Sequence, residues 1–225
     1  MNIDCETCKV GSYTFYSKNK QDFIFKHLKS GNFFEKEILK QIRNQNISGI
    51  YVDVGANIGN HTLFFSEFCQ SEKVYSFECF PETYESLKRC VEDNHLEKVV
   101  LHNSACSNYT GASYMIEGKR NNSGTNKLTL EKSNIEVNVV TIDSILEHAD
   151  LLKIDVEGDE LNVLEGSLKL IENSKPLIIL EINPKTSRYN EHMRNYNSVM
   201  EMLNPFKYKK IWKDSGNTYI FKSSK

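Results

Sequence analysis

The sequence predicts an α/β fold in which helices pack on a mostly parallel, Rossmann-like sheet. Short apolar runs alternate with segments of helical spacing between residues 49 and 182, and the first run ends in a turn that contains two glycines. Strand, helix, strand, helix, strand is the order typical of a parallel sheet with right-handed crossovers. Two further runs near the C-terminus, joined through Asp214–Asn217, predict a closing antiparallel hairpin at one edge of the sheet.

The chain length bounds the number of domains. With 225 residues and 39% hydrophobic content, the chain can bury a full core and lies near the upper end of single-domain sizes. We therefore expect one domain over residues 1–225. It would comprise an N-terminal helical segment over residues 1–48 and a Rossmann-like core over residues 49–225.

The first strand of the core is predicted over residues 51–54. Residues 55–60 then form a strand-to-helix turn, and residues 61–68 have helical spacing. Glycines in such a turn adopt backbone angles closed to other residues and let a ligand approach the main chain. The start of the helix adds unpaired N–H groups. This combination is typical of a site for a small molecule.

The segments before and after the glycine turn continue the alternation of helices and strands. Residues 22–44 predict an N-terminal helix, residues 73–78 a second strand, and Pro81 the first position of the next helix. Residues 99–101 predict a third strand. Residues 108–134 are polar, and we expect a longer loop or small hairpin that is either a substrate lid or a variable insertion.

Regular structure resumes at residues 137–142 and at residues 151–155, a buried strand that ends in a carboxylate. Asp159 is expected to cap one helix whose apolar face runs from Leu161 to Ile171. Residues 176–182 predict another buried strand, and a final helix should stop before Pro205.

Acidic residues stand at four predicted strand ends: Asp53, Glu78, Asp155 and Glu181. Ligands of open parallel sheets bind outside the carboxyl ends of the strands. Turns favour acids, but four carboxylates on one rim indicate more than solvation. Glu78 also follows Gly55 at close to the spacing of roughly 20 residues at which an acid binds ribose hydroxyls in dinucleotide sites.

The glycine turn departs from a pyrophosphate-binding loop. Asn57 replaces the second glycine of G-x-G-x-x-G, and no G-K-[ST] motif is present. A ligand with a ribose and positive charge but no phosphate fits this turn better. S-adenosylmethionine, which yields S-adenosylhomocysteine as product, is such a ligand. A nicotinamide oxidoreductase is the alternative enzyme.

Three segments give the chain a resemblance to a known family: residues 52–63, residues 74–81 and residues 152–166. Together they resemble the FkbM-type methyltransferases, a branch of the class I S-adenosylmethionine-dependent enzymes. The resemblance covers about residues 22–182. It implies a seven-stranded sheet and O-methylation of a hydroxyl, often on a sugar or a polyketide-like product.

The resemblance also implies which residues contact the cofactor. The Gly55 turn would hold its methionine part, Glu78 its ribose, and residues 103–106 its adenine. The complete predicted set is Asp53, Gly55, Ala56, Asn57, Gly59, Glu78, Cys79, Phe80, Asn103, Ser104, Ala105 and Asp155.

The catalytic candidates are Asp155, Glu157, Glu181 and His61. Methyl transfer to an alcohol needs an acceptor for the hydroxyl proton, and Asp155 is the first choice because a strand end aims it into the cleft. His61 has a suitable ordinary pKa. Lys153 is expected to pair with one of the acids. No ligand spacing is diagnostic of a metal, so none is predicted as required.

Composition bounds the partners. A net charge of -2 and a pI near 6.3 give no broad basic field for nucleic acid, and no apolar run approaches a membrane span. We expect a soluble cytoplasmic protein with a small-molecule or glycan substrate and free cysteines, including the Cys5 and Cys8 pair in a loose N-terminus. The sequence does not predict its oligomeric state.

An alternative outside the enzymes is a non-catalytic module that binds S-adenosylmethionine.

Overall fold

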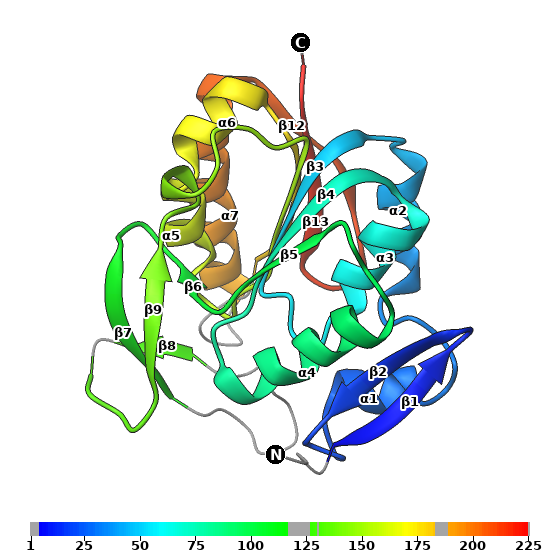
Figure 1. Ribbon diagram of the computed structural model, residues 1–225. Helices are drawn as coiled ribbons and strands as arrows, with labels where there is room; N and C mark the ends of the chain where they lie inside the picture. Colours follow the sequence, from blue (N-terminus) through cyan, green and yellow to red (C-terminus); the bar gives the residue numbers. More distant parts are fainter. Residues whose placement is uncertain (1–4, 117–126, 130, 183–188, 225) are drawn as a thin grey trace.

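A computed structural model describes residues 5–116, 127–129, 131–182 and 189–224. Its centre is a seven-stranded sheet in the order β12-β13-β11-β10-β3-β4-β5 (Figure 1). The strands are β3 (Ser48–Val54), β4 (Gln70–Phe77), β5 (Val99–His102), β10 (Leu151–Ile154), β11 (Leu177–Glu181), β12 (Tyr208–Lys213) and β13 (Thr218–Ser223). Strands β11, β10, β3, β4 and β5 are parallel, whereas β13 runs antiparallel to both of its neighbours. The predicted fold class and C-terminal hairpin are confirmed.

Two helical layers cover the sheet. Helices α5 (Glu160–Glu165), α6 (Leu168–Ser174) and α7 (Tyr189–Leu203) lie on one face, and α2 (Lys36–Asn44), α3 (Asn60–Phe68) and α4 (Pro81–Asp93) lie on the other (Figure 1). Successive strand residues alternate between the layers: Val52 packs in the cluster with α5 to α7, and Tyr51 packs with α2 and α3. Strands covered on both faces therefore appear in the sequence as continuous apolar runs.

The predicted helix over Leu161 to Ile171 is two helices, α5 and α6, which break at Gly166 and Ser167. Gly166 packs directly on the backbone of Ser107, where the chain enters from β6 (Ala105–Cys106). Asp159 occupies the N-cap position without a capping hydrogen bond. Its carboxylate instead accepts hydrogen bonds from Ser107 Oγ (2.7 Å) and Asn162 Nδ2 (2.6 Å), so the expected cap was wrong.

The N-terminal segment differs from the expected helix and loose end. It begins with a hairpin of β1 (Glu6–Val10) and β2 (Tyr13–Ser17), which places Cys8 in a strand packed on an apolar cluster. The helix expected over residues 22–44 is divided into α1 (Phe23–Leu28) and α2, with Gly31 at φ +77° between them. That backbone angle is one a helix cannot contain.

The polar stretch near residues 108–134 contributes to a second, four-stranded sheet in the order β6-β9-β7-β8. Its other strands are β7 (Gly111–Ile116), β8 (Lys127–Thr129) and β9 (Glu136–Val140), so the strand predicted over residues 137–142 belongs here. Residues 117–126 and 130 of the expected loop lie outside the described residues. The small sheet and the β1–β2 hairpin flank the same end of the molecule (Figure 1).

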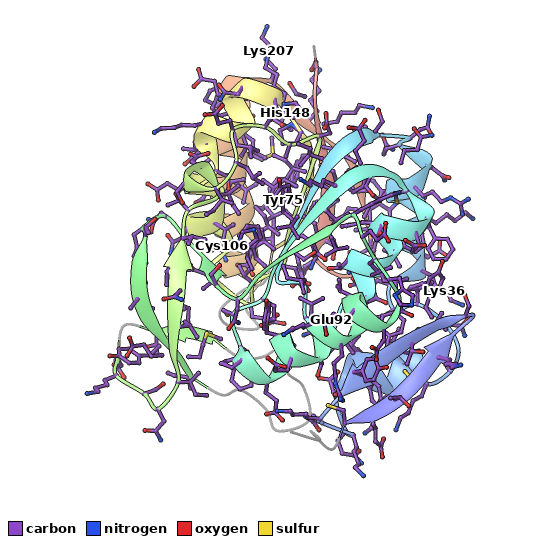
Figure 2. All side chains as sticks on the ribbon, viewed as in Figure 1. Lys36, Tyr75, Glu92, Cys106, His148 and Lys207 are labelled. Atoms are coloured by element: carbon purple, nitrogen blue, oxygen red, sulfur yellow. The ribbon has the colours of Figure 1, made fainter. Side chains whose placement is uncertain are left out.

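Short 3-10 helices, Ile142–Ser144 and Asn204–Phe206, complete the described structure. The side chains of His148 and Lys207 lie at the end of the molecule away from the small sheet, and Cys106 lies near the junction of the two sheets (Figure 2). Within the described ranges, no helix has the length and apolar character needed to cross a membrane.

We expect Gly166→Ala to destabilise the protein. A Cβ at this position would lie 2.1 Å from the backbone oxygen of Ser107, and a backbone atom cannot move aside as a flexible side chain can. Overpacking of this kind costs about 1–3 kcal/mol in the free energy of unfolding, measurable by urea denaturation. Gly111→Ala is the matched control, because the nearest atom to its Cβ would be 3.9 Å away. Equal stability of the two variants would contradict the prediction.

Candidate functional site

A cavity of about 250 Å³ opens at the carboxyl ends of β3, β4, β10 and β11. Parallel strands bring these ends to one edge, which is where open sheets bind ligands. Three other parts of the chain complete the walls: α1 with the start of α2, the small sheet, and the loop before α5. The lining residues are Phe23, Ile24, Phe34, Glu35, Val54, Gly55, Asn57, Phe77, Glu78, Cys79, Ser104, Ala105, Cys106, Met115, Leu128, Asp155, Val156, Glu157, Asp159 and Glu181.

The glycine turn forms the floor of the cavity. Gly55 has φ +77°, and a Cβ there would lie 1.8 Å from the backbone oxygen of Asp155. Two constraints therefore require glycine at position 55: its positive φ angle and the lack of room for a Cβ next to the backbone of Asp155. Asn57 also has a left-handed backbone, with φ 50°, a conformation that asparagine tolerates better than most residues. The position that holds the second glycine in G-x-G-x-x-G therefore has a left-handed backbone here too, although its residue is asparagine.

Glu78 ties this turn to the next helix. Its Oε2 accepts a hydrogen bond from the backbone N–H of Asn57 (3.0 Å), and its Oε1 accepts one from Phe80 (2.8 Å). Burial raises the pKa of Glu78 to about 7, although these two N–H groups oppose the shift. The buried carboxylate lines the cavity at the end of β4 and can accept further hydrogen bonds there.

Lys153 lies behind the lining of the cavity, where its ammonium contacts two acids. Its Nζ is 3.1 Å from Asp53 Oδ1 and 3.4 Å from Asp155 Oδ2, and it donates a hydrogen bond to the backbone oxygen of Gly55 (2.9 Å). Burial disfavours its charge, but Asp53 and Asp155 outweigh burial and raise the pKa of Lys153. Asp53 also accepts a hydrogen bond from Thr62 Oγ1 (2.7 Å). Lysine therefore remains charged in a fully buried position.

Asp155 and Glu181 form a hydrogen-bonded carboxyl pair in the cavity. Burial tends to raise the pKa of Asp155, but the charge of Lys153, together with the hydrogen bonds from Glu181 and Lys153, lowers it overall. The negative charge of Asp155, together with burial, raises the pKa of Glu181 to about 11. At neutral pH Asp155 is ionised and Glu181 keeps its proton, which it donates to Asp155.

Glu35 and His61 meet at the entrance to α2, with Glu35 Oε2 3.5 Å from His61 Nε2. Burial first, and then the charge of Asp155, raise the pKa of Glu35 to about 7. Burial, helped by Lys153, lowers the pKa of His61 to about 4. His61 is thus neutral at neutral pH, so its contact with Glu35 is not a full ion pair.

The predicted site residues fall into two groups. Gly55, Asn57, Glu78, Cys79, Ser104, Ala105, Asp155, Glu157 and Glu181 line the cavity together. Asp53, Ala56, Gly59, His61, Phe80 and Asn103 are not among its lining residues. Several of this second group support the first: Phe80 and Asn103 hydrogen-bond to Glu78, and Asp53 binds Lys153.

Sequence reasoning missed the apolar walls. Phe23 and Phe34 looked like helix residues, and Met115 and Leu128 lie on strands within a stretch that is polar overall. No spacing in the sequence signals that these side chains meet. Within the described residues, no group of three or more His, Cys, Asp or Glu side chains is arranged to hold a metal ion.

Comparison with known proteins places these features in a family. Residues 53–203 match the family model of the methyltransferase FkbM domain. Over 136 residues the chain is 29% identical to the hexuronic acid methyltransferase AglP of Haloferax volcanii, an alignment that covers 58% of this chain and 54% of AglP. The chain thus spans about half the length of this relative.

Solved structures share the fold at low sequence identity. The methyltransferase FkbM from Methylobacillus flagellatus superposes with a TM-score of 0.55 and 20% identity, over 78% of this chain and 43% of that protein. TYW2 from M. jannaschii, solved in complex with AdoMet, gives a TM-score of 0.52 at 14% identity, over 96% of this chain and 83% of that one. Since the family model covers two-thirds of the sequence, including the glycine turn and all four acidic strand ends, the chain belongs to the methyltransferase FkbM domain family.

Proposed function

We propose that this chain is an S-adenosylmethionine-dependent O-methyltransferase that acts on a hydroxyl group of a sugar or glycan. The observation that carries the proposal is the single cavity that brings the glycine turn, the buried Glu78 and the Asp155–Glu181 pair together. Family membership supports the reaction class. The hexuronic acid substrate in the name of AglP supports a sugar as acceptor, and TYW2 supports the cofactor.

The residues present fit this cofactor. The cavity offers carboxylates to a ligand that carries a sulfonium and an ammonium, and its turn lacks the phosphate cradle that a dinucleotide needs. Gly55, Ala56 and Asn57 would hold the methionine part, Glu78 the ribose hydroxyls, and Cys79, Ser104 and Ala105 the adenine. Asp53, Gly59, Phe80 and Asn103 would support these contacts from behind the lining. When bound, the cofactor supplies a methyl group activated by the positive sulfur.

Asp155 is the proposed proton acceptor. Lys153 keeps it ionised, and the proton of Glu181 fixes its carboxylate by a hydrogen bond. A hydroxyl that gains a methyl group becomes a strongly acidic oxonium, so even a carboxylate of low pKa takes its proton. Asp155 also orients the hydroxyl before transfer, and alignment is a large part of catalysis in an in-line displacement. Glu157 would bind the acceptor at the same rim, and His61 would act only through Glu35.

Titration calorimetry with S-adenosylhomocysteine and, separately, NAD tests the cofactor. We expect binding of the former, and tight binding of NAD without any response to S-adenosylhomocysteine would favour the oxidoreductase alternative. Release of S-adenosylhomocysteine during incubation with glycans and with non-sugar hydroxyl compounds then distinguishes an enzyme from a binding module, and a sugar from another acceptor.

Glu78→Ala should weaken S-adenosylhomocysteine binding by at least about tenfold. The variant removes a charged acceptor and frees the Asn57 and Phe80 N–H groups, and hydrogen bonds to charged groups are worth about 1.5–3 kcal/mol. Calorimetry measures the change. Glu82→Ala is the control, because this nearby acid is exposed and does not line the cavity. Unchanged affinity in Glu78→Ala would contradict the assigned role.

Asp155→Asn should leave S-adenosylhomocysteine affinity within about threefold and lower kcat by about 10²–10⁴, the usual contribution of a positioned base. The amide keeps the shape of the side chain but cannot take a proton. Calorimetry and a turnover assay on the same preparation measure the two effects. If affinity fell as far as turnover, Asp155 would be a cofactor ligand rather than the base.

Glu181→Gln should stabilise the protein more at pH 8 than at pH 5. The folded pKa of Glu181, about 11, exceeds its ordinary value of 4.5, so the folded protein holds a proton that the unfolded chain releases. This group therefore makes stability fall as pH rises above 4.5, and glutamine removes that loss while keeping a donor for Asp155. One pKa unit corresponds to about 1.4 kcal/mol, so we expect a gain above about 1 kcal/mol in urea unfolding. A gain independent of pH would argue against the shared proton.

A further inference from the structure

Two aromatic rings of the N-terminal segment stand at the cavity. Phe23, the first residue of α1, lines the cavity and is nevertheless 57% exposed. Its ring meets that of Phe34 edge to face, with 5.6 Å between ring centroids. Phe34 also lines the cavity and directly precedes Glu35. An apolar surface therefore stands next to a carboxylate at the mouth of the site.

A buried side chain, that of Asn60, positions the backbone of Phe34 in this aromatic surface. Asn60 accepts a hydrogen bond from the backbone N–H of Phe34 (2.9 Å) and donates one to its backbone oxygen (3.2 Å). Glu35 has a left-handed backbone, φ 56°, a conformation that costs a non-glycine residue about 1–2 kcal/mol. The fold tolerates this strain where it directs Glu35 toward His61 and the cavity.

The charge of the cavity has one sign. Its lining includes six carboxyl side chains, and no Lys, Arg or His appears among the described lining residues: Glu35, Glu78, Glu157, Asp155, Asp159 and Glu181 are the acids. Lys153 lies behind them, already bound to Asp53 and Asp155. The charge of Asp155 raises the pKa of both Glu35 and Glu181, so the acids already repel one another. An additional carboxylate placed beside Glu35 and Asp155 would be repelled by these acids.

We propose that Phe23, Phe34 and Glu35 form the acceptor subsite, and that it binds a neutral or amine-bearing sugar ring and rejects a uronic acid. The inference rests on the proposed function and deepens it. The apolar C–H face of a pyranose packs on an exposed aromatic ring, while its hydroxyls donate hydrogen bonds to carboxylates. Glu35 and Asp155 line the same cavity, so this subsite adjoins the proposed base.

Ligand-observed NMR with three probes tests the subsite: methyl β-glucopyranoside, methyl β-glucosaminide and methyl β-glucuronide. We expect the first two to bind through their ring protons, and the glucuronide to bind at least about tenfold more weakly. Phe23→Ala should weaken binding of the first two by roughly threefold to tenfold, the range expected for one aromatic contact. Ile211→Ala is the control, because Ile211 is 45% exposed and apolar but does not line the cavity.

Each binding experiment is run with and without S-adenosylhomocysteine, so that the two proposals fail separately. A glucuronide that binds as tightly as the glucoside overturns the charge argument. Unchanged binding by Phe23→Ala, or no binding of any probe, overturns the subsite. Probe binding that follows the expected order while S-adenosylhomocysteine does not bind would overturn the proposed function and leave the subsite supported. Glu35→Gln should bind the glucosaminide less tightly relative to the glucoside than the parent protein does.

Discussion

The buried ammonium of Lys153 is the interaction on which the rest of the site depends. Lys153 and Asp53 are paired residues on the adjacent parallel strands β10 and β3, and the lysine also reaches Asp155 and the carbonyl of Gly55. One charge thus joins two central strands to the glycine turn. Removing one partner of a buried ion pair typically costs about 3–5 kcal/mol, because the other charge is left uncompensated. The turn and the carboxyl rim are held by the same contact.

The protonation states of the rim follow from this charge. Lys153 stabilises the ionised form of Asp155, and ionised Asp155 in turn keeps Glu181 protonated and raises the pKa of Glu35. The carboxyl groups therefore do not behave as equivalent acids. Asp155 is ionised and accepts the proton that Glu181 donates, and burial leaves His61 neutral. The protonation state of each of these side chains is therefore set by its surroundings rather than by its residue type.

Much of the central sheet and its carboxyl rim was predictable from the sequence, because strands buried on both faces produce apolar runs that end in turns. The four acidic strand ends and the Gly55 turn were found this way. The aromatic wall was not, because Phe23 and Phe34 reach the cavity only through the break between α1 and α2 and the left-handed backbone of Glu35. The β1–β2 hairpin was missed because its short strands carry few buried residues. A local sequence pattern does not show which residues that are far apart in the chain come into contact.

The walls of the cavity come from two parts of the chain. The core supplies the residues proposed for the reaction, and the N-terminal segment supplies those proposed to bind the acceptor. Gly55, Glu78, Asp155 and Glu181 lie within the segment that matches the family, residues 53–203, whereas the wall of Phe23, Phe34 and Glu35 precedes it. The residues that match the family model therefore include the parts that would hold the methyl donor and accept the proton, whereas this wall lies outside the matched range. A site built in this way can change its acceptor wall without replacing the acids at the strand ends, because the aromatic wall and those acids belong to different segments of the chain.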